Sequence, residues 1–189
     1  ICDEGGKFLN KFIDFYNNPD TQKYSKKLSD FHVVAIEHTK CGTYAEALHR
    51  LPFPLINMAE SYVKEKEAEF IAKSMLVGSG PILKKLLRNN PSYTIGIVGP
   101  GKVGSKTLYL LLENYPEASF CLYDKESSVY TSGDIESLRQ EDGRWQRVSR
   151  SGSIEQLFQQ NAIVFSFTGH DITADLPSDF FTANHTPMN

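Results

Sequence analysis

Apolar residues alternate between strand-like runs and helix-like spacings along the first third of the chain. Within residues 8–16 they recur at three- and four-residue intervals, which predicts a short helix with one buried face. Residues 31–36 are apolar and β-branched and predict a buried strand, and 55–58 is a further candidate strand. A short strand is expected at 1–3 and a short helix at 43–50. This alternation is typical of a parallel α/β layer.

The middle of the chain has a long helical pattern followed by the clearest strand. Residues 61–88 are expected to be helical, and Gly78-Ser79-Gly80-Pro81 should break or kink the helix. The run 94–98 predicts a buried strand. A helix with apolar residues on one face is expected at about 103–115, and another strand at 119–123.

The last third is harder to interpret because residues 125–150 are mostly polar. We expect a helical segment at 134–139 and a short strand at 145–148. Ser153, with Gln156 three residues later, has the spacing of a helix N-cap, so a short helix to residue 160 is predicted. Residues 162–167 predict another buried strand.

Composition and charge narrow the class of protein. The chain has 189 residues, 40% of them hydrophobic, and a net charge of −3, so a packed core is expected and a basic nucleic-acid-binding face is not. Apolar runs are too short for a membrane span, and the start lacks the pattern of a signal peptide. The three cysteines and five histidines show no metal-ligand spacing. We therefore expect a cytoplasmic protein with reduced thiols and no metal, no nucleic acid and no membrane among its partners.

The segment Gly99-Pro100-Gly101-Lys102-Val103-Gly104 carries the chemistry that is most specific in this sequence. It matches the pattern GxGxxG, it follows a predicted strand, and it opens a predicted helix. The next predicted strand ends at Asp124, 20 positions after the third glycine. This context predicts a dinucleotide site in a Rossmann-like parallel sheet with helices on both faces.

Each part of the motif has a physical role in such a site. Gly99 permits the tight turn, Gly101 lets a pyrophosphate approach the backbone, and Gly104 lets the helix pack close to the sheet. The helix amino end, at Lys102 and Val103, presents N–H groups and partial positive charge to phosphates. Asp124 favours NAD over NADP because its carboxylate can bind the ribose 2′-hydroxyl, although Lys125 follows it. The alternatives are a glycine turn that binds nothing and a site for another nucleotide.

Five segments resemble S-adenosylhomocysteine hydrolase (adenosylhomocysteinase) in order and spacing. They are I-C-D-E-G-G at 1–6 against I-L-D-D-G-G, I-E-H-T-K-C-G at 36–42 against S-E-E-T-T-T-G, P-L-I-N-M-A-E-S-Y-V-K at 54–64 against P-A-I-N-V-N-D-S-V-T-K, the glycine loop against G-Y-G-D-V-G, and F-T-G-H-D-I at 167–172 against T-T-G-N-I-D. The resemblance implies a permanently bound NAD that oxidises the 3′-hydroxyl of a nucleoside while a thiol is eliminated or added.

The resemblance also implies roles for single residues. Lys64 matches a catalytic lysine, Glu4 a catalytic aspartate, and His38 stands in place of a catalytic glutamate. Cofactor contacts are implied for Thr39, Thr168 and Gly169.

Several positions depart from the pattern of the family. Lys40 and Cys41 replace two cofactor threonines, while Ala68 and Glu69 replace a substrate-binding aspartate and asparagine. The cofactor pattern is therefore largely kept, and the substrate pattern is damaged.

Three hypotheses are compatible with the sequence. The chain is an NAD-dependent, adenosylhomocysteinase-like enzyme with altered or lost hydrolase activity, a non-catalytic NAD-binding scaffold, or a nicotinamide-dependent dehydrogenase domain acting on a small alcohol or amino acid. We expect a partial substrate-lobe-like α/β segment at 1–60, connecting helices at 61–91 and a Rossmann-like domain at 92–189. The half-sheet at the amino end would expose an apolar edge. We therefore expect a homo-oligomer, or a piece of a longer protein covered by another domain, with a nucleoside-like substrate if it is active.

Overall fold

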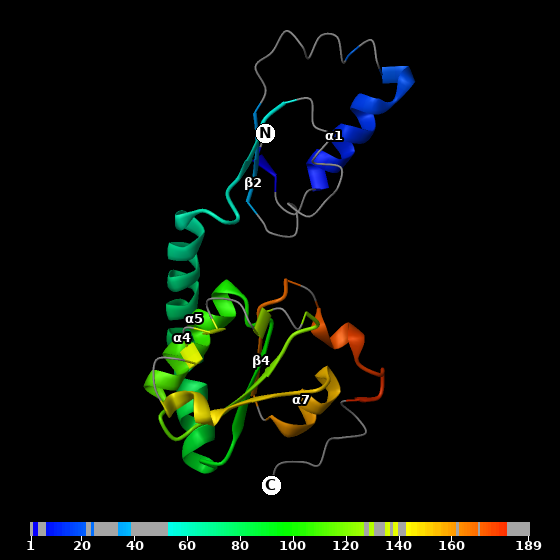
Figure 1. Ribbon diagram of the computed structural model, residues 1–189. Helices are drawn as coiled ribbons and strands as arrows, with labels where there is room; N and C mark the ends of the chain where they lie inside the picture. The colour runs from blue at the N-terminus through cyan, green and yellow to red at the C-terminus, as the bar shows by residue number, and fades with distance from the viewer. Residues whose placement is uncertain are drawn as a thin grey trace. The chain divides into compact units, whose positions relative to one another are not determined.

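The computed structural model shows two compact units, Ile1–Glu67 and Ala68–Asn189 (Figure 1). It describes residues 2–3, 7–21, 24, 34–38, 53–126, 129–130, 135–136, 138–139, 143–161, 163–169 and 171–180. No helix in these ranges has the length and apolarity that crossing a membrane requires. The three-part division at residues 60 and 91 stays a prediction.

The first unit contains a small parallel sheet. Its strands are β1 (Cys2–Asp3), β2 (Ala35–Glu37) and β3 (Leu55–Asn57), in the order β1-β2-β3. Both pairings are parallel, which confirms the predicted parallel layer. β2 begins later than the predicted strand at 31–36, whose first three residues lie outside the described ranges, as does the helix predicted at 43–50.

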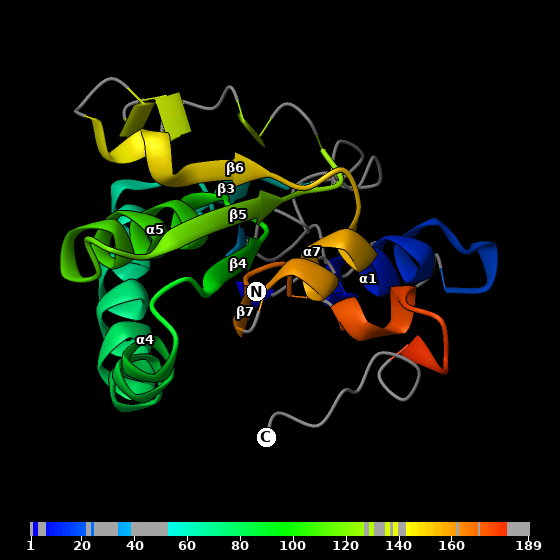
Figure 2. The same ribbon diagram turned by 90° about the horizontal axis from the view of Figure 1, so that it is seen from below.

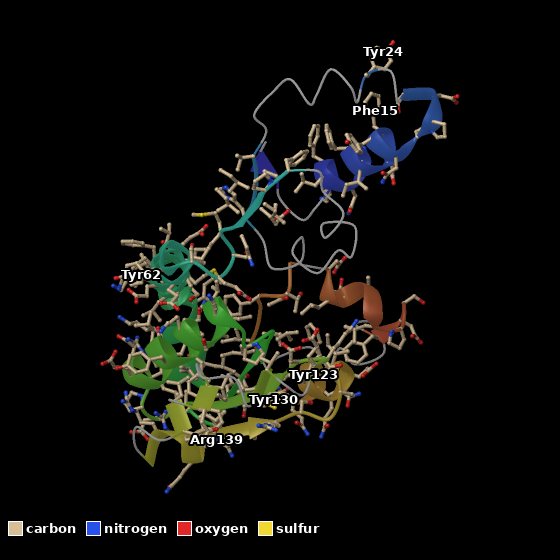
Figure 3. The ribbon with its side chains drawn as sticks, turned by 45° about the horizontal axis from the view of Figure 1, so that its top comes forward. Phe15, Tyr24, Tyr62, Tyr123, Tyr130 and Arg139 are labelled. Atoms are coloured by element: carbon tan, nitrogen blue, oxygen red, sulfur yellow. The ribbon has the colours of Figure 1, made fainter. Side chains whose placement is uncertain are left out.

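Helix α1 (Lys7–Asn17) supplies the core of this unit, and the single-turn helix η1 (Pro19–Thr21) follows it. The buried residues Leu9 and Ile13 pack with Ala35 of β2, which confirms the predicted helix at 8–16 and its buried face. Beyond this core, the rings of Phe15 and Tyr24 lie 6.3 Å apart between centroids (Figure 3).

The second unit is built on a four-stranded parallel sheet. The strands are β4 (Thr94–Val98), β5 (Ser119–Tyr123), β6 (Val148–Arg150) and β7 (Ile163–Ser166). Their order is β6-β5-β4-β7, and all three pairings are parallel. The chain therefore runs outward from β4 to β5 and β6, and then returns to place β7 on the other side of β4.

Helices cover both faces of this sheet. Helices α4 (Tyr62–Asn89) and α5 (Lys102–Asn114) lie on one face, and α7 (Ile154–Gln160) lies on the other (Figure 2). Along β4 the side chains alternate accordingly: Ile95 and Ile97 pack in the cluster with α4 and α5, whereas Val98 packs with α7. The predicted α/β architecture with helices on both faces is confirmed.

The predicted break at Gly78-Ser79-Gly80-Pro81 is wrong, because α4 continues through these residues. Pro81 lacks the N–H that would bind the carbonyl of Val77, but Val77 is 78% exposed, so water can satisfy that carbonyl. On the opposite side Leu83 is buried in the core. Packing along that side therefore keeps the helix continuous.

The strand predicted at 145–148 is also largely wrong. Residues Gly143–Arg147 form a 3₁₀ helix, η4, and strand β6 begins only at Val148. Arg147 explains the difference, since its guanidinium donates to the carbonyl oxygens of Leu112, Tyr115 and Ala118, each at 2.9 Å. These tertiary contacts hold the segment in a turn, and the local sequence pattern cannot predict them.

The predicted cap of the last helix is confirmed. Ser153 Oγ accepts a hydrogen bond from the Gln156 N–H at 3.2 Å, and Gln156 Oε1 accepts one from the Gly152 N–H at 3.0 Å. The helix ends at Gln160, as predicted. A further 3₁₀ helix, η5 (Ile172–Asp175), follows β7.

Candidate functional site

The glycine loop lies at the carboxyl end of β4, between the ends of its two neighbours. The Gly99 N–H donates to the carbonyl oxygen of Tyr123, the last residue of β5, at 2.9 Å. On the other side, the Phe167 N–H donates to the Val98 carbonyl oxygen at 2.9 Å. Because the chain leaves β4 toward β5 and later returns beside β4 as β7, this is the point where open α/β sheets bind ligands.

The fold itself requires glycine at positions 99 and 104. Gly99 has a φ of +76°, and a Cβ atom there would lie 3.0 Å from Thr168 Cγ2. A Cβ atom at Gly104 would overlap the carbonyl oxygen of Gly99 and would also approach the ring of Phe167. Gly99 thus permits the turn out of the strand, and Gly104 permits close contact between α5 and the loop.

Gly101 differs from these two glycines. It lies at the N-cap of α5 with a φ of −70°, and a Cβ atom there would meet no atom of the described residues within 4 Å. No side chain caps this helix end. The amide groups of Lys102 and Val103, in the first turn, therefore face an open surface with the positive end of the helix dipole. Nothing in the described part of the chain requires glycine at position 101.

Asp124 follows β5 directly, next to the start of the loop, as predicted. Its Oδ1 accepts a hydrogen bond from the Glu126 N–H at 2.9 Å, which orients the carboxylate. Within the described ranges no group donates to Oδ2. The carboxylate is half-buried at the sheet edge, where it could accept a hydrogen bond from a ribose hydroxyl.

Tyr130 supports the backbone of Asp124, and no pattern in the sequence predicts this contact. The backbone N–H of Asp124 donates to the Tyr130 hydroxyl at 2.6 Å, and the guanidinium carbon of Arg150 lies 4.0 Å from the centre of the tyrosine ring. Burial raises the pKa of Tyr130 above 10.0, although the hydrogen bond from Asp124 opposes the rise. Tyr123 and Tyr130 are labelled in Figure 3. Tyr130 lies in the polar segment whose pattern predicts no buried residue.

The end of β7 forms the other side of the loop. Thr168 Cγ2 and the backbone at Phe167 surround Gly99, and Ser166 Oγ lies 3.4 Å from Thr168 Oγ1. Gly169 has a φ of +69° and open space around it. The structure therefore brings Thr168 and Gly169 beside the glycine loop. Phe167 was not predicted as a site residue, although its ring packs against Gly104.

The candidate catalytic residues lie in the first unit. His38 follows β2 directly and is exposed. Lys64 lies in the first turn of α4, and its Nζ forms an ion pair with Glu67 Oε2 at 2.6 Å. Glu4 and Thr39 lie outside the described residues, as do Lys40 and Cys41. The structure thus places Lys64 in an ion pair on its own helix, and the catalytic roles stay predictions.

Two further positions bear on the substrate pattern. Ala68 is 2% exposed within α4, so its methyl group is packed and offers nothing polar to a substrate. Glu69, on the next position of the helix, is half-buried.

Comparisons with known proteins add little to this site. No protein-family model matches the sequence, and no characterised protein sequence matches it either. Among solved structures, the chain is similar to a D-isomer specific 2-hydroxyacid dehydrogenase from Lactobacillus delbrueckii ssp. bulgaricus, crystallised in an NAD-complexed form. The identity is 14% and the TM-score 0.48, and the match covers 78% of this chain and 45% of the dehydrogenase. This chain therefore spans less than half of that enzyme.

Proposed function

We propose that the second unit binds NAD, with the pyrophosphate on the glycine loop and the adenosine ribose at Asp124. One observation carries the proposal: the described residues require glycine at 99 and 104 but not at 101, where a Cβ atom would lie in open space. A phosphate can approach the backbone closely only where no side chain is in the way and the N–H groups of a helix end are free. Gly101 meets both conditions, and no contact with the described residues otherwise explains a glycine at this position. Asp124 Oδ2 would accept a hydrogen bond from a ribose hydroxyl.

Gly101→Val tests this proposal. The variant should fold normally because a Cβ atom at position 101 meets no described atom within 4 Å, yet the methyl groups of the valine would occupy the proposed place of the pyrophosphate. We expect NAD binding in the unchanged protein, measured by isothermal titration calorimetry, and a loss of at least about tenfold in affinity in the variant. Gly78→Ala is the matched control, since Gly78 also has open space around it but lies in α4.

Two results would contradict the proposal. The first is that the unchanged protein shows no binding of NAD. The second is that Gly101→Val binds NAD as tightly as Gly78→Ala does. Circular dichroism of each variant separates a lost site from a lost fold.

We further propose that the protein is related to adenosylhomocysteinase and that its hydrolase activity is altered or lost. The support is the ordered resemblance together with the packed methyl group of Ala68, which replaces a polar substrate contact. His38 stands where the family has a carboxylate, and an imidazole can serve as a general base in place of that group. The chain would then act on a substrate other than S-adenosylhomocysteine.

The spectrum of the cofactor distinguishes this enzyme from a non-catalytic scaffold. With NAD bound, adenosine-like alcohols are added and the absorbance of reduced nicotinamide is followed. An active enzyme should produce reduced cofactor, and Lys64→Met should slow it while leaving NAD affinity unchanged. NAD binding without reduction by any nucleoside would support the scaffold and contradict the enzymatic proposal.

A further inference from the structure

A cavity of about 380 Å³ lies in the second unit, away from the glycine loop. It is formed where the last turns of α4 meet the end of α5 and the turn that leads into β5. The glycine loop lies at the other end of α5, and the 13 residues of this helix separate the two places by roughly 18 Å. The cavity is therefore a different site from the proposed NAD site, and its volume is in the range of small-molecule pockets.

The lining of the cavity combines apolar and basic side chains. Leu87, Pro91 and Pro116 supply apolar surface. Lys84 and Arg88 both line the cavity, one helical turn apart. Within the described part of the chain neither of them forms an ion pair, although like charges at this spacing repel each other. An anion between them would remove that repulsion.

Basic residues are common in the last turns of helices, so their presence alone does not indicate a site. Here the two basic residues that line the cavity, Lys84 and Arg88, lie on the same side of α4. Lys85 has the same charge on the same turn but does not line the cavity. One acidic residue, Glu117, is also in the lining. With two cations and one carboxylate, the lining has a net charge of +1, which suits a monoanion better than a dianion.

The turn that contains Tyr115 and Ala118 forms the other wall of the cavity, and hydrogen bonds within the chain hold it in place. Arg147 donates to the carbonyl oxygens of Tyr115 and Ala118, both at 2.9 Å, from outside the cavity. Burial raises the pKa of the Tyr115 hydroxyl, which therefore stays neutral at physiological pH and adds no negative charge beside the site. The turn that forms this wall is thus fixed before any ligand arrives, which lowers the entropic cost of binding.

We propose that this cavity binds a small organic monoanion with a flat apolar body, such as an aromatic carboxylate. The apolar body lies on Leu87 and Pro116, and the carboxylate accepts hydrogen bonds from Lys84 and Arg88. Arg88 can bind a carboxylate through two parallel N–H groups. A bare inorganic anion would leave the apolar part of the lining in contact with water, so the ligand needs both an apolar body and a charge.

The test titrates 2-naphthoate into the full chain by calorimetry. We expect saturable binding with one site, and a loss of roughly tenfold in affinity in Arg88→Gln, as expected when a charge-assisted hydrogen bond is removed. Lys85→Gln is the matched control and should bind like the unchanged protein. Glu117→Gln should bind more tightly, because it removes a negative charge from the lining.

Three results of these titrations would overturn the proposal. The first is no saturable binding of 2-naphthoate, and the second is an equal affinity for 2-naphthalenemethanol, which lacks the charge. The third is an equal loss of affinity for 2-naphthoate in Lys85→Gln and Arg88→Gln. Displacement of 2-naphthoate by NAD in a one-to-one competition would also overturn it, since the ligand would then lie at the glycine loop. NMR spectra of the backbone amides of each variant check that the fold is intact. The titration of 2-naphthoate without NAD tests this cavity whether or not the glycine loop binds NAD.

Discussion

The backbone of Gly104 passes so close to the carbonyl oxygen of Gly99 that a Cβ atom at position 104 would overlap this oxygen. This contact joins the first turn of α5 to the end of β4. The same loop therefore serves two purposes: its outer glycines close the junction between strand and helix, and the middle one leaves the backbone accessible.

Gly104→Ala should destabilise the second unit by about 1–3 kcal/mol, because the added methyl group must displace backbone atoms. Urea denaturation followed by circular dichroism measures the change. Gly101→Ala should change the stability by less than about 0.5 kcal/mol, as is usual for exposed positions without special contacts. Equal destabilisation by the two variants would contradict the different roles assigned to these glycines.

Arg147→Met should destabilise the protein by about 2–4 kcal/mol. The substitution keeps much of the side-chain length but leaves the carbonyls of Leu112, Tyr115 and Ala118 without their shared donor. The control is Arg139→Met, where an exposed ion pair with Glu136 at 3.3 Å is lost and a change below about 1 kcal/mol is expected. Urea midpoints of the two variants give the comparison. A smaller effect at 147 than at 139 would contradict the anchoring role of Arg147.

Tyr130→Phe should lower the free energy of unfolding by about 1 kcal/mol near neutral pH, because the Asp124 N–H loses its acceptor. The pH dependence is a second test. Since the pKa of Tyr130 is raised above 10.0 in the folded state, its stabilising contribution is complete below pH 10 and is lost as the pH rises through the folded pKa. The difference between the two proteins should therefore shrink above pH 10. A difference that grows there would contradict the assignment.

Ser153→Ala should destabilise the protein by about 1 kcal/mol, because the amide of Gln156 loses the oxygen that caps α7. Thermal unfolding measures the effect. The control is Ser119→Ala at the exposed first residue of β5, which should be nearly neutral. A neutral result at Ser153 would show that the cap contributes nothing to stability.

The sequence predicted the elements whose signals are local. β4 and β5 have the predicted bounds, and α7 was predicted from one capping pair, because alternation and capping depend only on neighbouring residues. Local signals fail where distant contacts decide the structure. Pro81 stays within a helix because of packing around Leu83, and Arg147 holds its segment in a turn.

The site shows the same limit. The glycine spacing and Asp124 could be read from the sequence because the motif is contiguous with its strand and helix. Tyr130 and Phe167 could not, since their contacts with Asp124 and Gly104 arise only when the strand ends meet. The difference between Gly101 and the other two glycines is also visible only in three dimensions.

Mapping NAD on the backbone amides by NMR tests the central claim most directly. On addition of NAD to the full chain, the largest chemical-shift changes should fall on Gly101, Lys102, Val103 and Gly104, with a second group around Asp124. The same experiment on Gly101→Val should show these changes greatly reduced, while the spectrum of the fold is kept. If NAD produces no shifts, or shifts confined to residues outside the glycine loop and the end of β5, the loop is not a dinucleotide site.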